Sequence, residues 1–322
     1  MFRKMLQTIL VPTTVVLALA LFAPAFAHAQ TSSVTTALAL FGGTYGKYGT
    51  TAMCAANYGS TNSYELDCND ALSSGAGFFT FSSDGTIHPY AYPGNCLDLS
   101  GNMLPCNGSQ QQQWYFLDGV IQTRWRGNSG CLSAGIPATQ GIILYVQPCN
   151  QQMQQVFIPT GVSMTFENPS NSSCLYYSTA PNSSVGSEPC NSADPAQAFF
   201  FTFGSNVADS ENGFYTLLEA STSSGSQCVT YSGTWGDDAN LDPNCNTSSY
   251  DGAWEFWRYT ADYRLENAQT ISGQNTCLNV AEPGSPTNAV TEQGCAAAAT
   301  PQQTWYMWIN GFPYRRLPTP RA

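Results

Sequence analysis

Basic side chains are scarce in this sequence of 322 residues. Ten lysines and arginines stand against 21 aspartates and glutamates, so the formal net charge is −11 at pH 7. Polyanions bind proteins whose lysines and arginines displace their counterions, and this charge therefore disfavours nucleic acid, anionic lipid and sulfated polysaccharide as partners. Neutral glycans remain compatible with such a surface.

Histidine is scarcer still, since only His28 and His88 occur, and no cysteines have the C-x-x-C spacing of a zinc site. These counts disfavour histidine-based metal sites and histidine-activated nucleophiles. The sequence also has no G-x-S-x-G element, no zincin helix and no phosphate-binding glycine loop. Adjacent acids such as Asp237 and Asp238 do not establish the opposed carboxylates of a glycoside hydrolase. We expect no cofactor, no metal and no enzymatic activity.

Long apolar runs are absent except near the start, from about Ile9 to Phe26, where two basic residues precede the run. The Ala-His-Ala that follows has the small-x-small form that signal peptidase accepts. We therefore interpret residues 1–29 as a signal peptide and expect a secreted, extracellular protein. The alternative is a membrane anchor, but two prolines interrupt a run of marginal length, and we expect no membrane insertion.

Cysteine, in contrast, is plentiful, and all twelve cysteines follow residue 29. An even number of cysteines in a secreted chain indicates a disulfide framework. The cysteines occur as close pairs with wider gaps between the pairs. The pairs are Cys54/Cys68, Cys96/Cys106, Cys131/Cys149, Cys174/Cys190, Cys228/Cys245 and Cys277/Cys295.

These pairs define six sequence repeats. An apolar residue usually follows the first cysteine, as in Cys-Leu-Asp-Leu at residues 96–99, and this alternation is typical of a half-buried strand. A large aromatic residue follows the second cysteine, and in four repeats a glutamine stands two positions before it. We assign the aromatic position to Phe79, Trp114, Phe157, Phe199, Trp254 and Trp305.

Turn signals separate short strand-like segments throughout the chain. Asp84-Gly85, Asp118-Gly119 and Asn310-Gly311 are hairpin signals, and no helical periodicity of useful length is present. This pattern predicts an all-β fold. The repeats form two sets of three, over residues 36–160 and 161–322, with no proline- or serine-rich linker between them. We expect one domain for each set.

The Cys-Leu-Asp element, the proline before the second cysteine and the Q-x-W element, repeated along the chain after residue 29, resemble the ricin B-type lectin family. The resemblance implies two tandem β-trefoil domains, in each of which three repeats close around a shared core. It implies that the two cysteines of each pair form a disulfide. It also implies that the Q-x-W aromatic is buried and that the glutamine bonds a backbone group.

A complete sugar site of this family combines the aspartate of Cys-x-Asp, an aromatic ring two residues before the second cysteine, and polar residues ending at the Q-x-W glutamine. No repeat has the whole set. The second repeat keeps the aspartate but has Leu104 at the ring position, and its aspartate could instead cap a loop. The candidate carbohydrate-binding residues are Asp98, Gln111, Gln112, Asn279, Gln293, Gln302, Gln303 and Trp235.

We therefore expect a secreted lectin that binds neutral glycans or glycoproteins through shallow sites on its repeats. The alternative is a secreted β-trefoil that binds proteins, such as a protease inhibitor, because the sugar sites are incomplete. N-x-S/T sequons predict glycosylation of exposed loops at Asn107, Asn171, Asn182 and Asn246. The sugar and the oligomeric state stay open.

Overall fold

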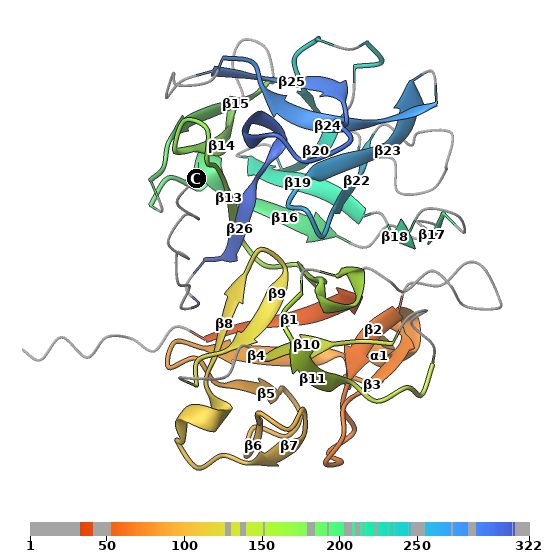
Figure 1. Ribbon diagram of the computed structural model, residues 1–322, viewed down its shortest axis with the longest axis vertical. Coiled ribbons are helices and arrows are strands. Elements are labelled where there is room, and N and C mark those ends of the chain that lie inside the picture. The colour runs from red at the N-terminus through yellow and green to blue at the C-terminus, as the bar shows by residue number, and fades with distance from the viewer. Residues whose placement is uncertain are drawn as a thin grey trace, which may run out of the picture. The chain divides into compact units, whose positions relative to one another are not determined.

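A computed structural model shows a chain built almost entirely of short strands (Figure 1). It describes residues 33–40, 53–125, 130–135, 140–150, 152–178, 184–191, 193–202, 208–209, 213–214, 216–222, 225–230, 232–234, 236–243, 245, 255–271, 273–282, 288–310 and 312. The predicted signal peptide, residues 1–29, lies outside the described residues. Residues 32–322 form one compact unit. No helix in the described part of the chain is long and apolar enough to span a membrane.

The first three repeats alternate strands with tight turns. Their elements are β1 (Ser33–Leu40), β2 (Met53–Ala56), β3 (Tyr64–Asp67), α1 (Cys68–Ser73), β4 (Phe78–Ser82), β5 (Ile87–Pro89), β6 (Asn95–Leu97), β7 (Met103–Pro105), η1 (Gln110–Gln112), β8 (Trp114–Leu117), β9 (Val120–Thr123), β10 (Gly130–Ser133), β11 (Tyr145–Pro148), η2 (Met153–Gln155) and β12 (Phe157–Thr160). Burial alternates with the two-residue period of a strand. In β8, Trp114 and Phe116 are buried, whereas Tyr115 and Leu117 are half-buried.

The last three repeats have the same construction. Their elements are β13 (Met164–Asn168), β14 (Ser173–Ser178), β15 (Ser184–Pro189), η3 (Pro195–Gln197), β16 (Phe199–Thr202), β17 (Ala208–Asp209), β18 (Gly213–Phe214), β19 (Thr216–Thr222), β20 (Gly225–Thr230), β21 (Asn240–Asp242), β22 (Phe256–Tyr259), β23 (Leu265–Ile271), β24 (Gln274–Val280), β25 (Asn288–Gly294), η5 (Pro301–Gln303) and β26 (Tyr306–Ile309).

Each set of repeats closes on itself, because its first strand pairs with its last. β1 pairs antiparallel with β12, from Ala37 opposite Thr160 to Leu40 opposite Phe157. β13 pairs antiparallel with β26, from Met164 opposite Ile309 to Glu167 opposite Tyr306. Closure leaves neither terminal strand as an open edge. The prediction of an all-β chain with two tandem β-trefoils of three repeats is confirmed.

All six predicted disulfides are present, one in each repeat. They join Cys54 to Cys68, Cys96 to Cys106, Cys131 to Cys149, Cys174 to Cys190, Cys228 to Cys245 and Cys277 to Cys295. Each disulfide closes a short loop and is worth about 3 kcal/mol through the lost entropy of the unfolded chain. The described residues contain no free cysteine.

In the four repeats that have it, the Q-x-W glutamine forms hydrogen bonds with the backbone at the end of the cysteine hairpin. Gln112 Nε2 donates to Pro105 O at 3.1 Å, and its Oε1 accepts the Asn107 N–H at 2.9 Å. The same pair of bonds, to one backbone oxygen and one N–H, recurs at Gln155, Gln197 and Gln303. In each case the glutamine ends a short 3-10 turn and is buried. This glutamine therefore has the structural role that the resemblance implies.

The core tryptophans repeat one hydrogen bond as well, and they correct one assignment. Trp114 Nε1 donates to Leu97 O at 2.8 Å, and Trp305 Nε1 donates to Leu278 O at 3.1 Å. In the fifth repeat the equivalent donor is Trp257, whose Nε1 lies 2.7 Å from Val229 O. Trp254, which we expected here, lies outside the described residues. The glutamine signal was missing because Glu255 stands two positions before Trp257.

The turn after β8 joins the two sets of repeats. Asp118 N donates to Met307 O at 2.8 Å, and Asp118 Oδ1 accepts the Met307 N–H at 2.9 Å. The Tyr259 hydroxyl lies 3.4 Å from the same carboxylate oxygen and donates to Trp305 O at 2.7 Å. Phe81 and Phe312 pack edge to face beside this turn, with ring centroids 5.0 Å apart. A buried carboxylate therefore stands where the two sets meet.

Candidate functional site

Asp98 forms the turn that follows β6. Its Oδ1 accepts the Ser100 N–H at 3.1 Å, and Gly101 N donates to Asp98 O at 2.8 Å. Gly101 has a φ of +83°, and a Cβ there would lie 3.1 Å from Tyr145 Cα, so the turn requires glycine. Asp98 thus caps its own loop with one oxygen. Its second oxygen, Oδ2, has no hydrogen-bond partner among the described residues, so both roles that we considered for Asp98 are compatible with the geometry.

Gln111 and Gln112 stand next to each other but have different surroundings. The backbone carbonyl of Gln111 accepts the Leu99 N–H at 2.9 Å, which holds Gln111 beside the Asp98 turn, and its side chain is exposed. Gln112 is fully buried, and both ends of its amide bond the backbone. The structure therefore holds the backbone of Gln111 beside the Asp98 turn, whereas burial keeps the Gln112 amide from a ligand.

The candidates in the sixth repeat also differ in burial. Asn279 in β24 is half-buried, and its Nδ2 donates to Val280 O at 3.0 Å. Gln293 in β25 stands opposite Cys277 and is half-buried, as is Gln302. Gln303 is buried and bonds Gly294 O and Ala296 N, so it has no amide atom left for a sugar. Trp235 lies outside the described residues.

A buried glutamate beside these residues was not found from the sequence. Glu292 Oε2 accepts the N–H and the hydroxyl of Ser232, at 3.1 and 3.0 Å, and Oε1 is buried without a partner. Burial, followed by the charges of Asp237 and Asp238, raises the pKa of Glu292 to about 8. In the first set, Glu65 likewise accepts the Gly135 N–H. The two donors, Gly135 and Ser232, each stand four positions after the first cysteine of their own repeat. These glutamates join neighbouring repeats, a long-range role that no local motif reveals.

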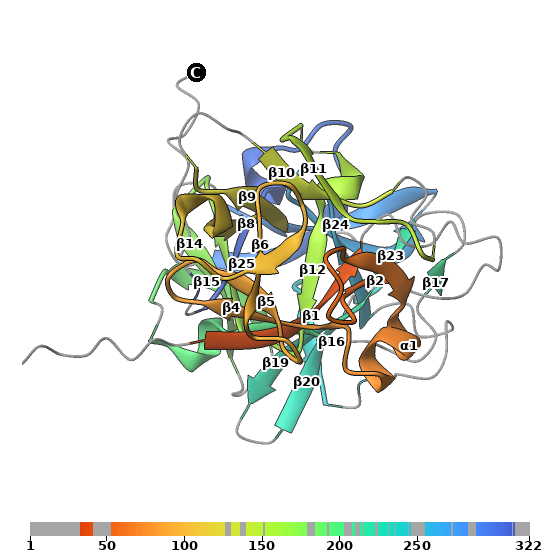
Figure 2. The same cartoon turned by 90° about the horizontal axis from the view of Figure 1, so that it is seen from below.

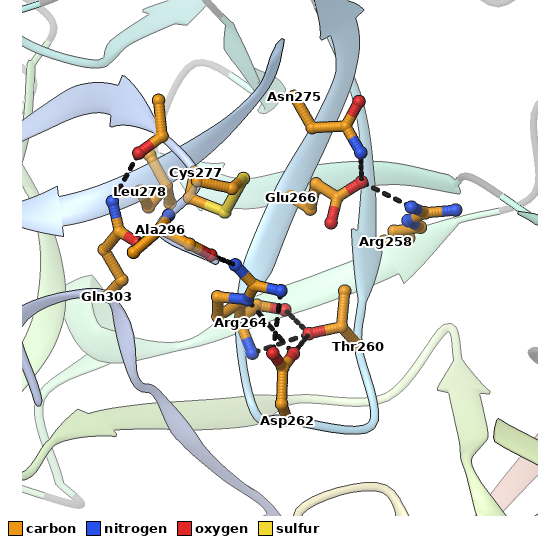
Figure 3. Close-up of a disulfide and its surroundings, with 12 residues drawn as sticks. Arg258, Thr260, Asp262, Arg264, Glu266, Asn275, Cys277, Leu278, Ala296 and Gln303 are labelled. Carbon is orange, nitrogen blue, oxygen red and sulfur yellow. Dashed lines mark hydrogen bonds and ion pairs between the residues drawn. A yellow bond between two sulfur atoms is a disulfide. The ribbon is translucent and has the colours of Figure 1, made fainter. Parts of the chain in front are cut away.

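Two groups of side chains have the spacing of a metal site, but their sulfurs are not free. The groups are Glu219 with Cys228 and Cys245, and Glu266 with Cys277 and Cys295. In both, the cysteines form a disulfide and offer no thiolate. Figure 3 shows that Glu266 is also occupied, because one carboxylate oxygen bonds Arg258 and Asn275 Nδ2. Neither group offers the ligands that a metal ion needs.

The sequons that the structure describes lie in capped turns. Asn107 is exposed, and its Oδ1 accepts the Ser109 N–H at 2.8 Å. Asn171 is half-buried, and its Oδ1 accepts the Ser173 N–H at 3.1 Å and the Ser173 hydroxyl at 2.6 Å. Asn182 and Asn246 lie outside the described residues. Glycosylation at all four positions stays a prediction.

Comparison with known proteins gives a family for the middle of the chain. Residues 101–199 match the model of the ricin-type beta-trefoil lectin domain. The resemblance to ricin B-type lectins is confirmed. This lectin match covers parts of both sets of repeats, from the Asp98 turn to β16. No curated protein matches the chain.

Solved lectin structures show a more distant likeness. An agglutinin from Abrus precatorius is 16% identical over 85% of this chain and 96% of its own, with a TM-score of 0.34. A non-toxic homologue of type II RIPs from Momordica charantia, in complex with alpha-methyl-D-galactoside, is 16% identical over 85% of this chain and 96% of its own, with a TM-score of 0.33. The hemolytic lectin CEL-III is 17% identical over 87% of this chain and 64% of its own, with a TM-score of 0.32.

Replacing Gln112 and Gln111 in turn should separate stability from binding. Gln112→Ala removes two hydrogen bonds and should lower the free energy of unfolding by about 2 kcal/mol. The affinity of the folded variant for glycan should stay unchanged. Gln111→Ala, the matched control, should change stability by less than about 0.5 kcal/mol and weaken glycan binding. Urea unfolding measures the stability and calorimetric titration measures the affinity for glycan. A lower affinity in folded Gln112→Ala protein would show that Gln112 contributes to the binding site.

Proposed function

We propose that this chain is a secreted lectin that binds neutral glycans, with its principal site at the Asp98 turn of the second repeat. The lectin-domain match supports carbohydrate binding in general. The observation that carries the finer proposal is the backbone bond from Leu99 to Gln111, which holds the exposed Gln111 beside the Asp98 turn, where Asp98 Oδ2 has no partner among the described residues. A carboxylate and an amide side by side can bond neighbouring sugar hydroxyls.

Charge and compartment support the other parts of the proposal. Residues 48–123, which include the Asp98 turn, contain no lysine or arginine. The next cation, Arg124, donates to Asp84 O and lies over the Tyr115 ring, so the Asp98 turn has no cation of its own for a sulfated, phosphorylated or sialylated ligand. The six disulfides require an oxidising compartment, which supports secretion. Binding should need no metal ion, because carboxylate and amide bond hydroxyls directly. Sequencing of the secreted protein's N-terminus should find Gln30.

Substitutions at Asp98 test the site. Asp98→Asn keeps an oxygen for the Ser100 N–H but loses the charged acceptor, which is typically worth about 1.5–3 kcal/mol. We expect glycan affinity to fall about tenfold or more while the melting temperature stays near that of the wild type. A glycan array with the full chain identifies the sugar, and calorimetry with that sugar measures the affinity.

Asp84→Ala is the matched control for these measurements. Asp84 caps a turn through Thr86, with Oδ1 2.9 Å from the Thr86 N and 2.7 Å from its hydroxyl, but no exposed amide stands beside it. Its loss should cost stability and leave affinity unchanged. If Asp98→Asn keeps the wild-type affinity for glycan, the principal site does not lie at the Asp98 turn. A silent array, together with inhibition of a protease by the same preparation, would favour the protein-binding alternative.

A further inference from the structure

The large apolar side chains that the structure leaves exposed are unevenly distributed. Within the described residues they all lie in the first set of repeats, between Tyr58 and Met153. Four of them are tyrosines, and three of these, Tyr58, Tyr90 and Tyr92, are 51%, 62% and 43% exposed. Single exposed aromatics are common on proteins, whereas a group of them marks a surface that binds something.

Hydrogen bonds bring the segments that hold these tyrosines around the end of α1. Asn57 N donates to Ala76 O at 2.9 Å, and Tyr90 N donates to Phe78 O at 2.9 Å. The Ser74 hydroxyl lies 3.5 Å from the Tyr58 hydroxyl. The segments that carry Tyr58 and Tyr90 therefore meet at one short turn, residues 74–78. Figure 2 turns this side of the first set, with α1, β2 and β5, toward the viewer.

The backbone under the rings is held in place. Asn57 is fully buried, and its Nδ2 donates to Ser60 O and Asn62 O at 3.0 and 2.8 Å. Its Oδ1 accepts the Gly59 N–H at 2.8 Å. The ring of Tyr92 lies against Gly59, where a Cβ would come within 2.6 Å of the ring atoms Cε1 and Cζ. Rings on such a support lose little conformational entropy when a ligand binds.

We propose that Tyr58, Tyr90 and Tyr92 form a second glycan-binding surface, on which the apolar faces of neutral sugar residues stack. This inference rests on the proposed function and extends it to a part of the first repeat that has Ala56 where the family's sites have an aspartate. A pyranose ring combines an apolar C–H face with hydroxyls, and tyrosine combines an aromatic face with a hydroxyl, so the two are complementary.

The surroundings favour a neutral glycan over an anionic one. No lysine or arginine occurs between residues 48 and 123, whereas Asp67 and Asp70 stand at the start of α1. A sulfate, phosphate or carboxylate group at this surface would meet negative charge with no cation from that stretch to offset it. An uncharged sugar that stacks on the rings meets no electrostatic repulsion from these carboxylates.

Calorimetry on the full chain tests the proposal, with cellotetraose, mannotetraose, chitotetraose and N-acetyllactosamine as probes. Tyr90→Ala and Tyr92→Ala should each weaken binding of the probe that binds best by about fivefold to tenfold. Tyr90→Phe keeps the ring and should retain most of the affinity. Trp125→Ala is the matched control, because Trp125 is 39% exposed in the first set and takes no part in the contacts described at either glycan surface; it should bind as the wild type does.

Nitration of tyrosine by tetranitromethane, followed by peptide mapping, gives a readout that needs no variant. Saturating probe should protect Tyr58, Tyr90 and Tyr92 from nitration. A probe that binds, with wild-type affinity in the alanine variants and no protection of the three tyrosines, would refute the second glycan-binding surface. The proposed function would stand in that case. If no probe binds and a protein ligand protects these tyrosines instead, both are overturned.

Discussion

Separating the chain between Thr160 and Gly161 should yield two fragments that each fold. The fragment 30–160 keeps β1 with β12, and the fragment 161–322 keeps β13 with β26, so both barrels retain their closing pair. Each fragment also keeps all the disulfides of its three repeats. The first fragment must begin before residue 36, because Ser33, Val34 and Thr35 pair with β4. We propose these two fragments as the domains of the protein.

A cut near residue 210 is the matched control. It separates β13 from β26 and β16 from β19, and so opens the second barrel on two sides. The long fragment should then aggregate, because unpaired strands and core residues such as Phe199 and Phe201 become exposed. Gel filtration and circular dichroism distinguish the two cuts. Equal behaviour of the two pairs of fragments would contradict the grouping of three repeats with three.

The two folded halves should nevertheless be less stable apart than together. The separated halves lose the bonds between Asp118 and Met307 and the packing of Phe81 on Phe312. Mixing the fragments should therefore raise the melting temperature of both, in a manner that depends on concentration. Identical melting curves for mixed and separate fragments would show that this contact contributes no stability.

Replacing Asp118 with asparagine should stabilise the protein strongly at alkaline pH. Burial raises the pKa of Asp118 from 3.8 to about 7, against the opposing effects of the bonds from Met307 and Tyr259. The folded state therefore holds a proton that the unfolded state releases, and stability falls as the pH rises from about 4 to about 7. Asparagine keeps an oxygen for the Met307 N–H but never ionises. At pH 8 the variant should gain up to about 4 kcal/mol in the free energy of unfolding, at about 1.4 kcal/mol per pKa unit.

Urea unfolding at several pH values between 4 and 8 measures this gain. The difference between Asp118→Asn and the wild type should be small near pH 4 and should grow until about pH 7. Glu292, with its pKa of about 8, gives the wild type a slope of the same sign, but it is present in both proteins and cancels from the difference. A constant difference across the pH range would mean that Asp118 stays ionised.

Most of the local architecture could be predicted because it repeats. Cysteine pairing, the burial of Trp114 and Trp305 and the backbone bonds of the Q-x-W glutamines depend on residues within a single repeat, and six copies make the pattern visible. Where a repeat departs from the pattern, the prediction was wrong, as at Trp254. Trp257 takes that position in the core, and Glu255 replaces the glutamine that would have marked it.

The candidate site could be predicted only in part. A hydrogen bond within the second repeat, from the Leu99 N–H to the Gln111 carbonyl, holds the backbone of Gln111 beside the Asp98 turn, and sugar binding by the two residues stays a prediction. Gln112 and Gln303 have the right residue type, but burial and two backbone bonds occupy their amides. The sequence shows which side chains can bond a hydroxyl, and it does not show which of them are already bonded.

The sequence by itself determined the β class and the six repeats, which follow from composition and short-range periodicity, and the resemblance to the ricin B-type family implied the disulfide pairing. Only the tertiary structure decided that Asp118 is buried against Met307, that Glu292 binds a neighbouring repeat, and that the segments of Tyr58 and Tyr90 meet at one turn. The physical reason is that burial, desolvation and the grouping of exposed rings depend on contacts between residues far apart in the chain, which exist only once each barrel has closed.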